Sequence, residues 1–562
     1  MPIRRLLLVA LAPLVALMAP LARGEESRFV DLSLLVAPGY PCTWAEGFPE
    51  FRLEPVARVG RGSDYNVDTL HIDGNTGTQL DVPAHSVARP ELGLPHSSPM
   101  GNLFTDTVEP WKFGGEACVI DVADLLDSLP PGTSPLVTPE RVRDWERAHR
   151  PLGFGDAVLF RSGYADRYYR PLPEGRRFLC DPLERKAPAW PDPSPETMDA
   201  LASQGVMHIG TDSPTMGPMP ELGEPVHFAA MKYGATFTEG AAGLDRLPEE
   251  GAFYCILSPK HEGGPYGEGR AFAVVGGALP GRLIESVRGK RVIDLSVVMS
   301  PDLPLTWPGV GVGRHRQRYA RVDFLWSDNL GLYHHGHVFD SHAGTHLVPP
   351  SWALPPRPLP AGAMTPEARG WLEEYERDFG PRGTSDVTVE KVPLGQTCGP
   401  VRVVDVRDLV GSVPRAEWPA SPAITPEVIE RHEAARGRIE PGTVVIFLTG
   451  HVDRTFRPRR EAAECLANPL NGRSEGWPAA TPATVALLAD RGVRCVGIDA
   501  PTLGGVDPRG ALTTYWALGS RGMVAVEFLT NVAALPEEAF FLFAPVKIEG
   551  AHGAPGRAIA LH

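Results

Sequence analysis

Two tandem copies of one α/β domain are predicted by three features of the sequence. The chain has 562 residues, which is too long for one ordinary hydrophobic core. Segments of its first half return in the second half in the same order. Within each half, short apolar runs alternate with helix signals, as is typical of layered α/β domains. A junction near Pro280 to Lys290 divides the chain into copy one, residues 25–285, and copy two, residues 286–562.

Residues 1–24 are predicted to be a secretory signal peptide. Arg4 and Arg5 precede an apolar run from Leu6 to Leu21, and small residues stand before Glu25. The alternative is an uncleaved membrane anchor, but the run is short for a span of about 20 residues and contains two prolines. We therefore expect an exported protein, periplasmic or extracellular, with no stable membrane insertion after the signal is cleaved.

The repeat consists of short stretches that keep their order. The offset between them grows from 263 to 287 residues, so insertions in loops separate two copies of one unit. A period this long indicates a duplicated domain rather than a solenoid. The matching stretches are Phe29–Ser33 with Val292–Ser296, Val119–Val122 with Val403–Val406, Val137–Glu140 with Ile424–Glu427, and Thr211–Thr215 with Ile498–Thr502.

Each copy contains the same strand and helix signals. Buried strands are predicted where apolar residues rich in β-formers run together. Helices are predicted to begin at Ser194 and Thr481, because each hydroxyl is followed by proline, and to end near Gly205 and Gly492. The predicted strands are 157–160, 206–210, 444–447 and 493–497.

The composition is that of a globular protein. Apolar residues make up 43% of the chain and charged residues 22%. The net charge of −14 argues against nucleic acid as the main partner, because phosphate binding needs a positive surface. The seven cysteines are widely spaced and form no C-x-x-C pair that could bind zinc or carry out redox chemistry.

A composite motif emerges when the two copies are overlaid. In copy two, His342 and His346 flank Gly-Thr, and two imidazoles at this spacing can converge on one divalent cation. Alone, such a pair is more often two ordinary surface histidines. Copy one has the matching stretch from Asn75 to His85, which reads NTGTQLDVPAH. The composite is H-x-G-T-H-x-D-x-P-x-H.

This composite resembles the signature of the cyclase family, metal-dependent hydrolases that include bacterial kynurenine formamidases and isatin hydrolases. The resemblance covers nearly the whole of both copies, including an I-D-L-S-like strand at Asp31 and Asp294 and a T-D-S-P turn at Asp212. It implies a swivelling β/β/α-like domain in each copy. Similar single-copy proteins form dimers, so the fused copies are expected to pack as an intramolecular pseudo-dimer.

The resemblance also implies a divalent metal, zinc or manganese. In the family, the first two histidines and the aspartate of the signature bind the metal, a downstream histidine and glutamate hold a second ion, and the last histidine transfers protons. Copy one has Asn75 and Gln79 at the early ligand positions, although an amide oxygen can still bind a hard cation. His71 is an alternative ligand, but a lone strand histidine is more often solvated. The copy-one candidates are Gln79, Asp81, His227 and Glu239 for the metal, with His85 and Glu239 as catalytic residues.

Copy two is expected not to be a working site. It keeps His342, His346 and Glu527 as metal-ligand candidates. At the positions of the aspartate and of the two other histidines it has Val348, Trp352 and Tyr515. Valine removes a charge and a ligand, and the indole cannot move a proton. The nearby histidines are interpreted as an exposed loop, with a stray-metal site as the alternative; they are His334, His335 and His337.

The predicted function is hydrolysis of a C–N bond in an amide, formamide or cyclic amide. Trp44 and Trp307 are candidate substrate-binding residues, with core packing as the alternative. The rival interpretation is a degenerate, non-catalytic exported binding protein, suggested by the unequal loss of ligands. Kynurenine formamidase-like activity in tryptophan catabolism is the best-known role in the family, but an exported chain fits it poorly, and ring opening of an isatin-type substrate stays open.

Overall fold

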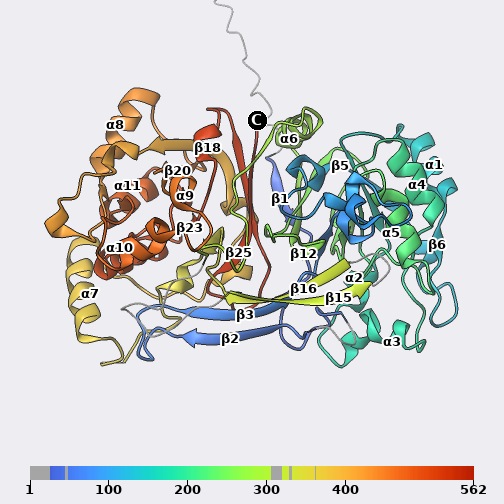
Figure 1. The fold of residues 1–562 in the computed structure, drawn as a ribbon, viewed down its shortest axis with the longest axis horizontal. Coiled ribbons are helices and arrows are strands. Elements are labelled where there is room, and N and C mark those ends of the chain that lie inside the picture. Colours follow the sequence, from blue (N-terminus) through green and yellow to red (C-terminus); the bar gives the residue numbers. More distant parts are fainter. Residues whose placement is uncertain (1–25, 45–48, 306–318, 328–331, 361) are drawn as a thin grey trace, which may run out of the picture.

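The computed structural model describes residues 26–44, 49–305, 319–327, 332–360 and 362–562, so the predicted signal peptide lies outside it. Two α/β units lie side by side, and each corresponds to one of the two predicted copies (Figure 1). None of the described helices is both long enough and apolar enough to cross a bilayer.

Copy one is built on a mixed nine-stranded sheet. Its strand order is β1-β13-β11-β5-β7-β9-β10-β4-β12, in which β5, β7, β9 and β10 are parallel neighbours. The strands are β1 (Arg28–Asp31), β4 (Gln79–Asp81), β5 (Gly114–Asp121), β7 (Asp156–Arg161), β9 (His208–Thr211), β10 (Thr236–Glu239), β11 (Ala252–Leu257), β12 (Tyr266–Glu268) and β13 (Arg270–Val275). The α-helices are α1 (Pro139–Ala148), α2 (Tyr164–Tyr168), α3 (Cys180–Leu183), α4 (Pro195–Ser203), α5 (Gly223–Met231) and α6 (Leu279–Arg288).

Copy two repeats this order with eight strands, because β25 spans the region that β12 and β13 divide in copy one. Strand β24 pairs with both β18 and β25, so the sheet closes on itself. The strands are β14 (Val292–Asp294), β17 (His346–Val348), β18 (Cys398–Asp405), β20 (Val444–Leu448), β22 (Cys495–Ile498), β23 (Val524–Glu527), β24 (Phe540–Pro545) and β25 (Ala554–Leu561). The α-helices are α7 (Pro366–Phe379), α8 (Pro426–Arg436), α9 (His451–Thr455), α10 (Asn468–Leu470), α11 (Pro482–Asp490) and α12 (Pro508–Ser520).

The helix boundaries follow the local signals in the sequence. Helix α4 begins after Ser194, whose hydroxyl accepts a hydrogen bond from the Thr197 amide at 3.3 Å. Helix α11 begins after Thr481, which caps Thr484 in the same way at 3.2 Å. Both predicted helices are confirmed, because a capping oxygen and a first-turn proline fix the start of a helix locally.

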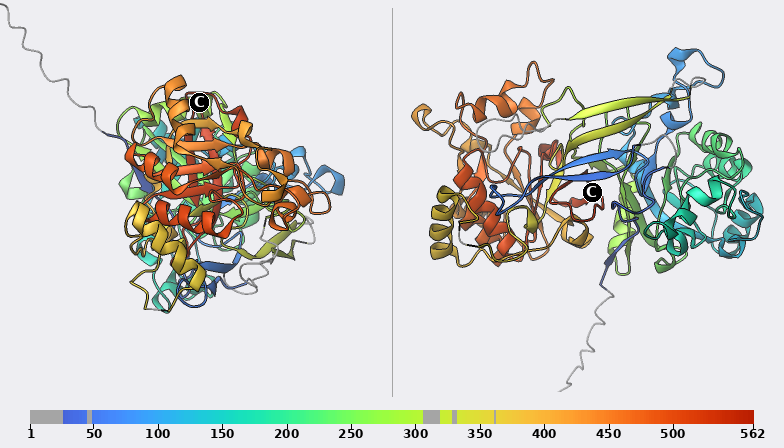
Figure 2. Two further views of the ribbon diagram at one scale, coloured as in Figure 1. Left: turned by 90° about the vertical axis from the view of Figure 1, so that its left-hand side faces the viewer. Right: turned by 90° about the horizontal axis from the view of Figure 1, so that it is seen from below.

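A four-stranded antiparallel sheet joins the two copies. It has the order β15-β16-β3-β2, and its central pair is β3 of copy one with β16 of copy two. The hairpins extend under opposite copies (Figures 1 and 2). The strands are β2 (Arg52–Ala57), β3 (Val67–Asp73), β15 (Ala320–Ser327) and β16 (Leu332–Asp340). The expected exposed histidine loop is therefore wrong, because His335 and His337 lie on β16 and are buried.

The contacts between the copies are arranged with pseudo-twofold symmetry. Lys547 of copy two pairs with Asp31 of copy one at 3.0 Å, and Lys260 of copy one pairs with Asp294 of copy two at 2.9 Å. One hydrophobic cluster also contains residues of both copies, among them Val30, Phe272 and Leu542. The two copies thus share one hydrophobic core and contact each other through equivalent ion pairs.

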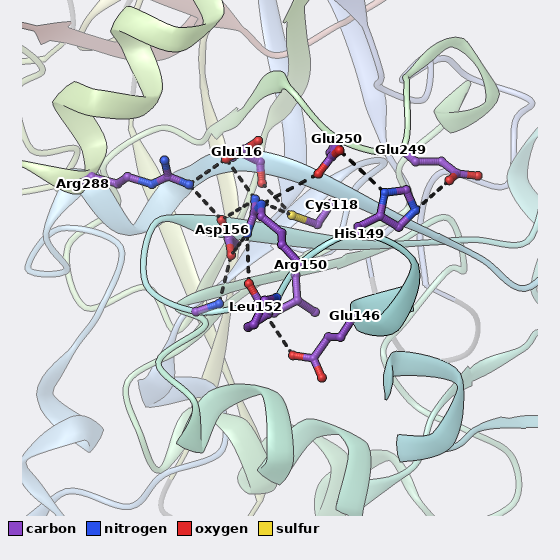
Figure 3. Close-up of polar contacts among 12 residues, drawn as sticks. Glu116, Cys118, Glu146, His149, Arg150, Leu152, Asp156, Glu249, Glu250 and Arg288 are labelled. Carbon is purple, nitrogen blue, oxygen red and sulfur yellow. Dashed lines mark hydrogen bonds and ion pairs between the residues drawn. The ribbon is translucent and has the colours of Figure 1, made fainter. Parts of the chain in front are cut away.

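A polar network lies at the amino-terminal ends of β5 and β7 in the copy-one sheet (Figure 3). Arg150 forms ion pairs with Glu116 on β5 at 2.9 Å and with Asp156 on β7 at 2.8 Å. The same guanidinium donates to the Cys118 thiol at 3.4 Å. Asp156 opens β7, whereas Glu239 closes β10, which runs parallel to β7 on the far side of β9. The network therefore stabilises the edge opposite the carboxyl ends of these strands.

Candidate active site

Four predicted residues of copy one come together at the carboxyl ends of the parallel strands, the edge at which open α/β sheets bind ligands. Glu239 is the last residue of β10, and Gln79 lies opposite it on the antiparallel neighbour β4. Asp81, two residues after Gln79, leaves β4 on the same face. His85 follows in a short 3-10 helix, and His227 projects from α5. A cavity of about 430 Å³ opens beside them, and His85, His227 and Glu239 line it.

Asp81, His85 and His227 form a group that can hold a metal ion. Each offers one ligand atom, and these atoms lie within 4.8 Å of one another. Both carboxylate oxygens of Asp81 are buried and accept no hydrogen bond from the described residues, although His227 Nε2 lies 3.5 Å from Oδ2. Burying a carboxylate without hydrogen bonds is costly, so the surroundings of Asp81 fit a cation. The donor set of carboxylate and imidazole is one that divalent metals accept.

The protonation equilibria reflect burial and crowded charge. Burial, reinforced by the nearby carboxylate of Glu239, raises the pKa of Asp81 to about 7. Burial and the neighbouring His227 hold the pKa of His85 well below its usual value, so His85 is neutral at pH 7. Burial opposes protonation of His227, but Asp81 and Glu239 outweigh it and raise its pKa to about 10. A divalent cation would replace the proton that these carboxylates attract.

Glu239 is held by four donors. His227 lies 3.1 Å from Oε1 of Glu239, and the Thr215 hydroxyl donates to the same oxygen at 3.1 Å. The Met216 amide and the Gln79 side-chain amide complete the set. Gln79 is thus next to the group, with its amide turned to Glu239. The donors at 215 and 216 were missed from the sequence, although Thr215 belongs to the repeated T-D-S-P-T stretch that points to them.

The other sequence candidates, Trp44, Trp307 and His71, lie in different places relative to the metal group. Trp44 lines the cavity and also packs against the hydrophobic core, and Trp190 is a further lining residue. Trp307 lies outside the described residues. His71 lies on β3 and contacts Glu54 at 3.4 Å, so it does not join the metal group.

The copy-two candidates lie close together but are organised differently. His346 contacts Glu527 at 3.2 Å, and the Tyr515 hydroxyl donates to the same carboxylate. The Trp352 ring packs on Tyr515 with centroids 4.4 Å apart. His342 stays beside His346, with ring centroids 5.2 Å apart. Over the part of the chain that the structure describes, copy two holds no group of three metal ligands like the one in copy one.

A family model matches both copies. The Cyclase family model, described as "Putative cyclase", aligns with residues 30–218 and again with residues 293–504, together more than half of the chain. The chain belongs to the Cyclase family. The two separate matches confirm the tandem duplication of the Cyclase unit.

Individual relatives of this Cyclase chain are hydrolases by name. It is 28% identical over 225 residues to a kynurenine formamidase of Erythrobacter litoralis, a match that covers 40% of this chain and 83% of the relative. It is 26% identical over 279 residues to an isatin hydrolase of Roseibium aggregatum, covering 47% and 98%. Isatin hydrolase A from Ralstonia solanacearum matches in structure with a TM-score of 0.38 and 23% identity, covering 51% and 98%. The sequence relatives support a hydrolase at the level of the Cyclase family.

Proposed function

We propose that copy one is the working site of an enzyme that hydrolyses a C–N bond in an amide, formamide or cyclic amide, in the manner of an arylformamidase. The observation that carries the proposal is the group of Asp81, His85 and His227 beside a cavity lined by two indoles, Trp44 and Trp190. The partly exposed Trp44 indole offers flat apolar surface to an aromatic substrate, whereas Trp190 is fully buried and supports the wall of the cavity.

The roles follow from position and charge. Asp81, His227 and Glu239 would hold the ion, with the Gln79 amide beside them. A zinc or manganese ion in such a site supplies a Lewis acid and an acidic bound water. His85 is neutral and lines the cavity, so it is able to take a proton there and pass it to the leaving nitrogen. Glu239 keeps His227 in place and supplies negative charge.

The test is metal content together with turnover of the purified mature protein. We expect about one tightly bound divalent ion per chain by elemental analysis, and hydrolysis of an N-formyl arylamine or of isatin followed by absorbance. Chelation should remove turnover, and added Mn²⁺ or Zn²⁺ should restore it. A chain without a bound ion that hydrolyses neither substrate contradicts the proposal.

A second candidate is a non-catalytic binding protein that retains the fold. The substitutions at ligand positions favour it: Asn75 and Gln79 in copy one, and Val348, Trp352 and Tyr515 in copy two. This protein would bind an aromatic amide in the cavity and release it unchanged. Saturable binding of the substrate to metal-loaded protein without product formation distinguishes it from the enzyme.

We also propose that the chain is exported and acts in the periplasm or outside the cell. The support is the charged and apolar pattern of residues 1–24. Expression of the full chain in a Gram-negative host, followed by fractionation and N-terminal sequencing, tests it. Mature protein beginning near Glu25 in the periplasmic fraction is expected, and retention of Met1 in the cytoplasmic fraction refutes export.

A further inference from the structure

A tyrosine in copy one takes the place of a glycine in copy two. The segments that begin at Lys260 and Lys547 align, and both lysines form equivalent ion pairs across the pseudo-twofold axis. In this alignment Tyr266 corresponds to Gly553. The change from no side chain to an aromatic one lies on β12, the strand next to β4 and its Asp81.

Copy one, which has the tyrosine, lacks the first signature histidine that copy two has at His342. In copy two, a Cβ at Gly553 would lie 2.5 Å from Nε2 of His342, so glycine is needed to leave room for the imidazole. In copy one, His342 is replaced by the shorter Asn75. The Tyr266 ring lies over the adjacent Gly74, where a Cβ would be 2.5 Å from its Cδ2. Tyr266 therefore uses the space that the first signature histidine uses in copy two.

Tyr266 lies next to the metal group. It is directly opposite Asp81 in the β12–β4 ladder, so both side chains leave the sheet on the same face. Its ring stands perpendicular to that of His85, with centroids 5.0 Å apart. Tyr266 is 4% exposed, and among the described residues its hydroxyl has no hydrogen-bond partner. A buried hydroxyl without a partner is unfavourable. The Asp81 carboxylate, which accepts no hydrogen bond from the described residues, is on the same face.

We propose that the Tyr266 hydroxyl is a ligand of the divalent cation held by Asp81 and His227, in place of the histidine that copy one lacks. This inference rests on the proposed function. On coordination the phenol O–H bond breaks, the oxygen binds the cation, and the proton leaves to solvent. With Asp81 and Glu239, Tyr266 makes the site rich in oxygen ligands, which suits a hard cation such as Mn²⁺.

The first experiment measures metal binding without any substrate. Mn²⁺ or Zn²⁺ is titrated by calorimetry into the chelator-treated mature chain, in two buffers of different ionisation enthalpy. Tyr266→Phe should weaken binding by roughly tenfold to a hundredfold or more, because loss of a supporting residue outside the ligand set already has an effect of that size. It should also release one proton fewer than the parent. Tyr254→Phe is the matched control, since Tyr254 is buried on β11 and donates to Thr238 instead.

A second experiment exchanges the two arrangements. Tyr266→Gly should lose metal affinity, and Asn75→His combined with Tyr266→Gly should regain it by rebuilding the copy-two pair. The double variant separates a lost ligand from a lost fold, because recovery requires the new imidazole. Fe³⁺ adds a direct signature: phenolate coordination gives a visible charge-transfer band, expected in the parent and absent in Tyr266→Phe.

The outcomes are distinct. If the parent binds metal and hydrolyses its substrate while Tyr266→Phe binds metal with unchanged affinity and proton release, this inference is wrong and the proposed function stands. If Asn75→His fails to rescue Tyr266→Gly in a variant with native circular dichroism, the exchange of ligands is also refuted. If the parent binds neither ion, both the inference and the proposed function fail.

Discussion

Replacing His85 with alanine is the sharpest test of how the copy-one site works. The imidazole lies between two rings, those of His227 and Tyr266, each with its centroid 5.0 Å away. Its burial keeps it neutral near pH 7, which is the form that accepts a proton. General acid–base catalysis by a positioned side chain contributes about 10²- to 10⁴-fold. We therefore expect kcat/KM to fall by that factor in His85→Ala, a change of about 3–5 kcal/mol in the barrier.

The assay separates proton transfer from metal binding. His85 also offers a nitrogen within 4.8 Å of the ligand atoms of Asp81 and His227. If His85 moves protons, the His85→Ala variant binds metal as tightly as the parent. Its pH profile of kcat then lacks the ionisation that His85, with its lowered pKa, gives the parent. If it is a ligand, metal affinity and kcat/KM fall together. The second result refutes the role proposed for His85.

Copy two supplies the matched comparison. His346→Ala removes an imidazole that contacts Glu527, just as His227 contacts Glu239 in copy one. We expect His346→Ala to retain kcat/KM within about twofold, because copy two has Trp352 where copy one has His85. Glu239→Gln, in contrast, removes a buried negative charge from the copy-one group and should abolish turnover. Loss of turnover in His346→Ala with one metal ion still bound would make copy two the catalyst.

Three further predictions concern stability. A bound ion at 100 times its dissociation constant should add about 2.7 kcal/mol to the free energy of unfolding, and Asp81→Asn should remove this gain in calorimetric melts with and without chelator. Burial lowers the pKa of His208 to about 3, so stability should fall as the pH drops from 6.5 towards 3, by about 2 kcal/mol at pH 5. His208→Gln should flatten that fall in urea titrations at pH 7, 6 and 5, and an unchanged slope would contradict the assignment. Lys547→Met should lower the free energy of unfolding by about 1–3 kcal/mol, because its partner Asp31 is largely buried. Lys391→Met, which removes the exposed pair of Lys391 with Asp386, should lower it by less than about 1 kcal/mol.

The parts of the fold that were predictable have local signals. The helix starts at Ser194 and Thr481 depend on a cap and a proline within a few residues, and the structure has both. The pairing of β3 with β16 joins residues more than 260 positions apart, such as His71 and Val338. Strand pairing over such a distance leaves no mark in a local window of sequence. The burial of His335 and His337 follows from that pairing, so their interpretation as loop residues failed with it.

The candidate site was predictable as far as the family motif extends. Asp81 and His85 match the motif, His227 and Glu239 match the family's downstream histidine and glutamate, and the structure brings all four to one place. Tyr266 and Trp190 have no place in the motif. Tyr266 becomes visible only when the space around Gly553 is compared with the space around Gly74. A large side chain on one segment can replace a large side chain on a distant segment, and such a compensation is recognised only when a structure shows that the two positions are neighbours.

The retention of copy two follows from the shared core, which leads to the last prediction. Apolar residues of both copies pack into one cluster, with Phe272 of copy one among Leu542 and Ile559 of copy two. Expressed alone, residues 25–285 would expose this surface to water at a cost of about 25 cal/mol per Å². We expect that fragment to be insoluble or aggregated, and co-expression of residues 286–562 carrying His346→Ala to restore a soluble, active complex. Linkage in one chain spares the association entropy that two free chains lose, so the complex should dissociate on dilution whereas the parent does not. A copy-one fragment that is soluble, monomeric and as active as the parent would show that copy two is dispensable.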